Sequence, residues 1–201
     1  QLKGWKFIYL NDVTSPAELP ADINSLKAQQ FRWTKGSIET GKKILPKVFR
    51  SNLPLKVKLE SFVHLAGNIV FPFIVLVALL NIPIVILKNQ VEGLDVYYSI
   101  MSVFVIASIS TFLFYMYAQR SINLDWRKRL LLFPVFLAGS MGLAINNSKA
   151  VFEALINKKT AFIRTPKFKI VDNKDDWKKK KYNSKKIGGV VFIELGLALY
   201  Y

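Results

Sequence analysis

The feature that most constrains this chain is a stretch from Phe62 to Leu87 in which no residue carries a formal charge, with His64 as the nearest exception. At about 1.5 Å of rise per helical residue, it covers the roughly 30 Å hydrocarbon core of a bilayer. Residues 97–118 form a second charge-free stretch. Because a bilayer core offers no water to the backbone, spanning segments of this kind are helical. We therefore expect two transmembrane helices.

The basic residues are distributed unevenly around these stretches. The chain has 29 Lys and Arg against 13 Asp and Glu, a formal net charge of +16, yet the connector 88–96 carries only Lys88. Cytoplasmic loops are rich in Lys and Arg. We expect this connector to face away from the cytoplasm, and the other basic segments to face it, in a multi-pass protein of the plasma or inner membrane. Binding to nucleic acid would explain only the charge. The aromatic residues that could stack on bases lie mostly in the apolar stretches and not among the cations.

A third apolar stretch, 130–146, is short, contains Pro134, and has basic segments on both flanks. A full crossing would place one of these flanks outside, so we expect residues 130–157 to lie in the interface or to re-enter, with a third crossing as the alternative. Residues 187–201 resemble the start of a further span. Glu194 within it is costly in lipid, which predicts that it faces protein or a water-filled path.

The region before the first span has a different pattern. Trp5 to Leu10 is rich in aromatic and branched residues, which predicts a strand. Asp22 to Thr34 is predicted to be a helix that stops near Gly36. Residues 37–61 interleave apolar residues with lysines and arginines, as in an amphipathic segment on an anionic membrane surface.

The most specific local signal is Gln29-Gln30-Phe31-Arg32-Trp33. On a helix, Gln29, Arg32 and Trp33 are spaced i, i+3 and i+4 and share one face. The guanidinium of Arg32 is a rigid fork of donors suited to phosphate, and the indole of Trp33 offers an apolar face for a sugar ring. By themselves, three such residues are more often a structural helix face.

This run resembles the Gln-x-x-Arg-Trp motif of the processive family 2 glycosyltransferases, which include cellulose, hyaluronan and glucomannan synthases. The segments Gly4-Trp5-Lys6-Phe7 and Glu18-Leu19-Pro20 look like the end of their catalytic domain, especially in the glucomannan synthase-like branch. The resemblance implies that Gln29 and Arg32 help to hold the donor diphosphate and that Trp33 stacks on the acceptor sugar.

A second match lies near the end of the chain. Phe162, Arg164, Thr165 and Lys167 resemble the Phe-x-Val-Thr-x-Lys gating loop of bacterial cellulose synthase, with Arg164 in place of the valine. A loop that closes over a nucleotide needs donors for phosphate, which Arg164, Thr165 and Lys167 supply. The alternative is a basic loop that contacts lipid headgroups. Glu18 is a further candidate, as a residue behind the site or on its acceptor side.

The resemblance implies a mainly α fold: a multi-pass helical membrane region with interfacial amphipathic helices, preceded by a remnant of a GT-A α/β catalytic domain. We expect the chain to be a C-terminal fragment organised in six segments. These are the end of the GT-A domain with the motif helix (1–36), an interfacial amphipathic segment (37–61), two transmembrane helices with connectors (62–129), interfacial or re-entrant helices (130–157), a cytoplasmic basic gating-like loop (158–186), and the start of a further transmembrane helix (187–201).

The resemblance also implies an activity for the whole protein. It would transfer sugar from a nucleotide-sugar donor to a growing β-linked polysaccharide and translocate the product, with accessory export subunits or further copies of the chain as additional partners. The family's catalytic base and its ligands for a divalent metal, Mg or Mn, fall upstream of this chain, so we expect the fragment alone to be inactive. The alternative is a non-catalytic transporter subunit or scaffold whose basic loops bind lipid.

Overall fold

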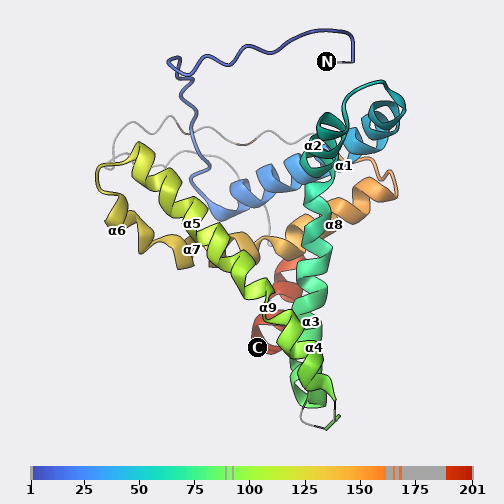
Figure 1. The fold of residues 1–201 in the computed structure, drawn as a ribbon, viewed down its shortest axis with the longest axis vertical. Helices are drawn as coiled ribbons and strands as arrows, with labels where there is room; N and C mark the ends of the chain where they lie inside the picture. Colours follow the sequence, from blue (N-terminus) through green and yellow to red (C-terminus); the bar gives the residue numbers. More distant parts are fainter. Residues whose placement is uncertain are drawn as a thin grey trace. The chain divides into compact units, whose positions relative to one another are not determined.

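The computed structural model describes residues 2–88, 90–91, 93–161, 165, 168 and 189–200. Within this part the chain forms helices and no strand. In chain order (Figure 1) they are α1 (Ile23–Arg50), α2 (Leu55–Ala66), the 3-10 turn η1 (Gly67–Ile69), α3 (Val70–Lys88), α4 (Leu94–Met101), α5 (Phe104–Ile122), α6 (Trp126–Leu130), α7 (Phe133–Gly142), α8 (Ala144–Leu155) and α9 (Val190–Tyr200). The chain divides into two compact units, Gln1–Pro72 with Ile145–Tyr201, and Phe73–Ala144.

Helix α1 begins where the sequence predicts and ends much later. Asp22 is its N-cap and accepts a hydrogen bond from the backbone N–H of Ser25 at 2.9 Å. The predicted stop near Gly36 is wrong, because the helix continues to Arg50. A glycine inside a helix costs only about 1 kcal/mol relative to alanine. Packing of the buried positions beyond it, such as Ile38 and Val48, outweighs this cost.

The predicted strand at Trp5–Leu10 is also wrong. These residues have no regular secondary structure, and their side chains are exposed, Phe7 to 91%. Aromatic and branched residues favour a strand only when a neighbouring strand pairs with their backbone. The described part of the chain offers no such strand.

The amphipathic segment 37–61 forms the second half of α1 and the first half of α2, separated by the turn at 51–54. The two helices approach closely at Gly41, and the Ser37 hydroxyl donates to the Leu65 carbonyl at 2.9 Å. Near the turn, the rings of Phe49 and Phe62 lie 6.4 Å apart. The alternation of apolar and basic residues in this segment therefore arises because one face of each helix, α1 and α2, packs against the other helix. Its placement on a membrane surface stays a prediction.

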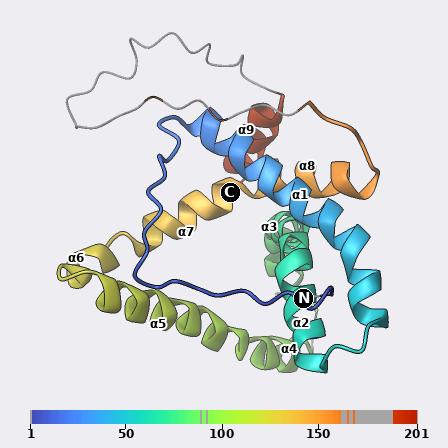
Figure 2. The same ribbon diagram turned by 90° about the horizontal axis from the view of Figure 1, so that it is seen from above.

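The first unit has a small core where α1 lies against α8 (Figure 2). Ile38 on α1 packs with Val151 and Ala154 on α8. Helix α8 ends in a Schellman motif: Asn157 has a φ of 57°, and the backbone N–H of Lys158 donates to the Glu153 carbonyl at 2.9 Å. This sharp stop directs residues 158–161 back along α1.

Helix α9 also belongs to the first unit and carries one acidic residue, Glu194. Its carboxylate forms an ion pair with Lys27 on α1. The prediction that Glu194 faces protein is therefore confirmed. The remaining oxygen, Oε1, is buried and has no hydrogen-bond partner among the described residues.

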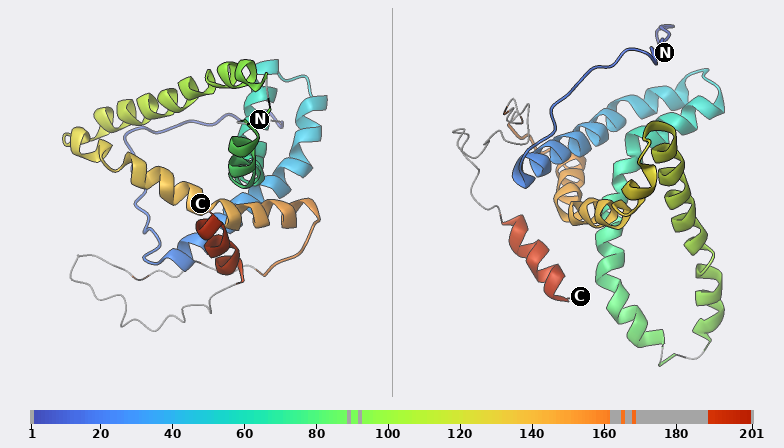
Figure 3. Two further views of the ribbon diagram at one scale, coloured as in Figure 1. Left: turned by 90° about the horizontal axis from the view of Figure 1, so that it is seen from below. Right: turned by 90° about the vertical axis from the view of Figure 1, so that its left-hand side faces the viewer.

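The second unit, Phe73–Ala144, contains most of α3 and the helices α4 to α7. In the right-hand view of Figure 3, the chain reverses between α3 and α4 near Gly93, which has a φ of 87°. The Tyr98 hydroxyl on α4 donates to the Ile84 carbonyl on α3 at 3.2 Å. Farther along, the Tyr115 ring on α5 stacks on the Phe136 ring of α7 at 5.9 Å.

Two helical stretches of the described chain, Leu55–Lys88 and Trp126–Leu155, are long and apolar enough to cross a membrane by length and composition. The first contains the predicted span 62–87. The second contains most of the region 130–157. The interfacial or re-entrant course of this region stays a prediction, with a third crossing as its alternative. The predicted span 97–118 is helical but divided between α4 and α5.

Candidate functional site

The N-terminal end of α1 is held by its cap. The Ser25 hydroxyl donates to Asp22 Oδ2 at 2.5 Å, and the backbone N–H of Ser25 donates to Oδ1. Partial burial raises the pKa of the Asp22 carboxyl, but the hydrogen bonds from the hydroxyl and backbone of Ser25 outweigh it and hold the pKa below the ordinary value. Two turns of well-anchored helix therefore precede the Gln29–Trp33 motif.

Two of the three motif residues open on one pocket. Arg32 and Trp33 line a pocket of about 1160 Å³, whereas Gln29 is not among its lining residues. Trp33 is 59% exposed, which leaves its indole accessible. Arg32 is half-buried, and its Nη2 donates to Thr165 Oγ1 at 2.9 Å. The structure thus brings Arg32, Trp33 and Thr165 together. The role of Gln29 in holding the donor diphosphate stays a prediction.

The pocket lies wholly within the first unit and is lined by four segments. Helix α1 contributes Asn24, Lys27, Ala28, Phe31, Arg32, Trp33, Lys35, Gly36 and Glu39; α8 contributes Asn146, Lys149 and Glu153; the following segment contributes Lys159, Thr160 and Ala161; and α9 contributes Val190 and Val191. Five cationic side chains face two carboxylates in this lining. An open pocket with excess positive charge and exposed aromatic faces suits an anionic ligand with a ring to stack.

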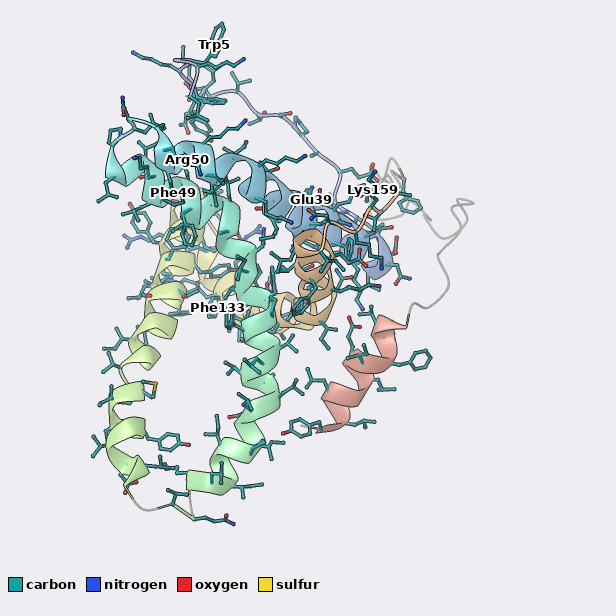
Figure 4. The ribbon with its side chains drawn as sticks, turned by 90° about the vertical axis from the view of Figure 1, so that its right-hand side faces the viewer. Trp5, Glu39, Phe49, Arg50, Phe133 and Lys159 are labelled. Atoms are coloured by element: carbon teal, nitrogen blue, oxygen red, sulfur yellow. The ribbon has the colours of Figure 1, made fainter. Side chains whose placement is uncertain are left out.

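Helix α1, helix α8 and the segment after α8 each contribute charged side chains to the pocket wall. Figure 4 shows Glu39 of α1 and Lys159 of the segment after α8 on the same side of the first unit, and both line the pocket. Asn146 fixes the opposite end of α8, since its side-chain amide donates to the Lys27 carbonyl at 3.0 Å. The wall is therefore built from α1 and α8 together.

The strongest polar cluster of the site was missed in the sequence analysis. Lys35 and Glu153 are both 6% exposed, and their charged groups lie 3.4 Å apart. A second lysine, Lys158, contacts the other carboxylate oxygen at 3.1 Å. One signal was present: Lys35 lies three residues before the core residue Ile38, so a helical pattern places it on the buried stripe. A lysine there needs an acidic partner.

Of the four predicted gating-loop residues, the structure describes Thr165. Phe162, Arg164 and Lys167 lie outside the described residues. Thr165 accepts the hydrogen bond from Arg32, and the backbone N–H of Phe168 donates to Glu18 Oε1 at 2.8 Å. Glu18 therefore contacts the chain just after the predicted loop, and Phe168 is buried at 5% exposure.

A metal site was expected outside this chain. Among the residues that the structure describes, no three His, Asp or Glu side chains gather into a group that could hold an ion. The carboxylates of the pocket, Glu39 and Glu153, do not form such a set, and Glu153 is neutralised by two lysines.

Parts of the chain are similar to plant enzymes. Glucomannan 4-beta-mannosyltransferase 1 of Oryza sativa subsp. japonica is 37% identical over 67 residues, 33% of this chain and 12% of the relative. Glucomannan 4-beta-mannosyltransferase 7 of Arabidopsis thaliana is 40% identical over 50 residues, 25% of this chain and 9% of the relative. Probable glucomannan 4-beta-mannosyltransferase 3 of Oryza sativa subsp. japonica is 46% identical over 43 residues, 21% of this chain and 8% of the relative.

The matched part of this chain thus spans about a tenth of the length of these relatives. No family model and no solved structure matches the chain. The partial matches support a relation to the cellulose synthase-like glycosyltransferases, the group that the Gln29–Trp33 motif resembles.

Proposed function

We propose that this chain is part of a membrane glycosyltransferase that transfers sugar from a nucleotide-sugar donor to a growing β-linked polysaccharide. The observation that carries the proposal is the shared pocket of Arg32 and Trp33, in which cations outnumber carboxylates. The similarity to mannosyltransferases of glucomannan supports it independently.

In this proposal Arg32 binds the donor diphosphate. Its guanidinium presents several N–H donors in a fixed plane, and such a fork matches phosphate oxygens in a bidentate manner. The bond from Nη2 to Thr165 Oγ1 fixes the orientation of the guanidinium plane. Lys149 and Lys159 add positive charge to the same pocket, which favours the departure of a diphosphate as its charge develops.

Trp33 is the proposed platform for the acceptor sugar. Its indole is more than half exposed beside Arg32, so a saccharide ring can cover its apolar face while the indole N–H stays available for a hydroxyl. The spacing of one residue between the two side chains would place an acceptor end next to an activated donor. Positioning of two reactants in this way lowers the entropic part of the barrier.

The remaining parts of the proposal concern the whole protein. The catalytic base and the ligands of a divalent Mg or Mn ion belong to residues outside this chain, which by itself is inactive. The metal, when bound, would neutralise the leaving diphosphate. The helical stretches cross the membrane and conduct the polysaccharide, and the motif helix and basic loops face the cytoplasm.

The test replaces Trp33 by Ala in the complete protein that contains this chain, and measures sugar incorporation into polymer in membrane vesicles. We expect polymer synthesis to be lost, because about 1–3 kcal/mol of stacking corresponds to a roughly 5- to 150-fold loss at every addition. Trp126→Ala is the matched control, since Trp126 lies on α6 and outside the pocket lining. Unchanged polymer output from the Trp33 variant would remove the acceptor role.

The donor is tested in the same vesicles by comparing GDP-mannose, GDP-glucose and UDP-glucose. The names of the relatives favour a mannosyl donor. Arg32→Lys should raise the KM for whichever donor is used, because an ammonium cannot reproduce the planar fork. If the wild-type protein transfers none of these sugars but binds anionic vesicles through its loops, the scaffold alternative is the better description.

A further inference from the structure

A buried lysine fastens one wall of the pocket. The ammonium of Lys35 lies 3.4 Å from Glu153 Oε2, and donates to the Lys158 carbonyl at 2.5 Å and to Thr160 Oγ1 at 2.9 Å. An ammonium has three N–H donors. These three acceptors use all of them, so Lys35 has no donor left for a ligand in the pocket, although its side chain lines it.

Two of the three acceptors of Lys35, the Lys158 carbonyl and the Thr160 hydroxyl, lie on the segment 158–161, which we call the strap. The strap follows the Schellman turn of α8 and contributes Lys159, Thr160 and Ala161 to the pocket. Glu153 compensates the buried charge, which would otherwise be costly. Lys35 itself lies two residues after Trp33 on α1. One side chain therefore connects the helix that carries Arg32 and Trp33 to the strap opposite.

We propose that Lys35 is a positioning residue: by clamping the strap to α1 it sets the spacing between Arg32 and the strap residues Lys159 and Thr160, and so sets the affinity of the pocket for a nucleoside diphosphate sugar. The proposal rests on the proposed function for the identity of the ligand. The clamp itself rests on the contacts of Lys35 alone.

The chain contains a matched control on the same helix. Lys42 lies seven residues after Lys35, two helical turns along the same face. Its ammonium donates to the carbonyls of Ala154 and Leu155 at 3.0 and 2.8 Å and to Asn157 Oδ1 at 2.7 Å. Lys42 thus clamps the end of α8 with three bonds as well, but it is not among the residues that line the pocket.

The experiment compares Lys35→Met and Lys42→Met in the complete protein in membrane vesicles. Both variants lose a clamp of three hydrogen bonds, so both should unfold at a lower temperature. Only Lys35→Met should raise the donor KM, on the order of 10- to 100-fold, because a misplaced binding wall weakens ground-state and transition-state contacts together. Lys35→Arg should restore part of the affinity. Equal effects of the two variants on KM, or none in either, would overturn the proposal.

A milder variant covers the case in which Lys35→Met does not fold. Thr160→Val removes one acceptor of the clamp without exposing or orphaning the buried carboxylate of Glu153. It should raise the donor KM several-fold and lower the stability less than Lys35→Met does, because only one N–H of the buried ammonium loses its acceptor. An unchanged KM would count against the clamp.

A readout without catalysis separates this inference from the proposed function. Hydrogen–deuterium exchange of the strap amides, 158–161, should be faster in Lys35→Met than in Lys42→Met. If the wild-type protein transfers no sugar, the proposed function fails, while faster strap exchange in the Lys35 variant alone still supports the clamp. If transfer is normal and strap exchange is the same in both variants, the clamp fails by itself.

Discussion

Helices α1 and α2 approach each other closely at Gly41, and this contact allows a prediction whose sign changes with side-chain size. A Cβ added at this position would lie 3.5 Å from Leu65 Cβ, 3.5 Å from the Leu65 carbonyl oxygen and 3.6 Å from Leu45 Cδ1. These are ordinary van der Waals distances. The site therefore accommodates a single methyl group, but Leu65 and Leu45 leave no room beside it for a larger side chain.

The magnitude for Gly41→Ala follows from two favourable contributions. Alanine is better than glycine inside a helix by about 0.8–1.0 kcal/mol, and three new contacts add about 0.1–0.2 kcal/mol each. We expect the free energy of unfolding to rise by about 1 kcal/mol. Gly36→Ala is the matched control: it lies in the same helix with nothing within 4 Å of its added Cβ, so it should yield the propensity contribution alone.

Gly41→Val should reverse the sign. Its two additional methyl groups project from a Cβ that already touches Leu65, and overpacking of a tight contact costs about 1–3 kcal/mol. The smaller propensity gain of valine does not offset this cost. We expect a net loss of about 1–2 kcal/mol, together with weakening of the Ser37–Leu65 hydrogen bond, which needs the close approach.

The assay is denaturant or thermal unfolding of the complete protein in detergent, with hydrogen exchange of the α1 and α2 amides to locate the change. The reasoning is refuted if Gly41→Ala is destabilising by 1 kcal/mol or more, or if valine is tolerated as well as alanine. Either result would mean that the two helices do not meet at this distance.

Two further predictions concern the core and the helix cap. Val151→Ala should lower the free energy of unfolding by about 2 kcal/mol, because Val151 is 1% exposed and loses two methyl groups to a cavity; the exposed neighbour Phe152, changed to Leu, should have little effect. Asp22→Ala should cost about 1 kcal/mol at pH 7. The pKa of Asp22 in the folded state lies below the ordinary value of an aspartate. The stability contributed by its carboxylate is therefore fully present at pH 7 and is lost as the pH falls through this lowered pKa. The difference in unfolding free energy between the wild type and Asp22→Ala should be smaller at pH 3 than at pH 7.

The relation between sequence and structure differs from one element to another. The helix start at Asp22 was predictable, because an N-cap depends on residues within three positions of it. The helical nature of 62–87 was predictable too, because a charge-free segment of that length has few other ways to satisfy its backbone. The end of α1 was not: Gly36 is a local signal for a stop, and contacts with segments far along the chain overruled it.

The candidate site, too, could be predicted from the sequence only in part. Local spacing was sufficient to place Arg32 and Trp33 on one helix face, and the structure brings both to one pocket. The partners of that face could not be derived, since Lys35 and Glu153 are 118 positions apart, and Arg32 and Thr165 are 133 apart. Helical periodicity can mark Lys35 as a buried charge that needs a carboxylate, but only the folded chain selects Glu153. The sequence by itself thus determined the start of α1, the helical nature of 62–87 and the position of Arg32 and Trp33 on α1. The packing of α8, the strap and α9 against that helix was decided by tertiary structure, because those contacts depend on distances in space that no local pattern encodes.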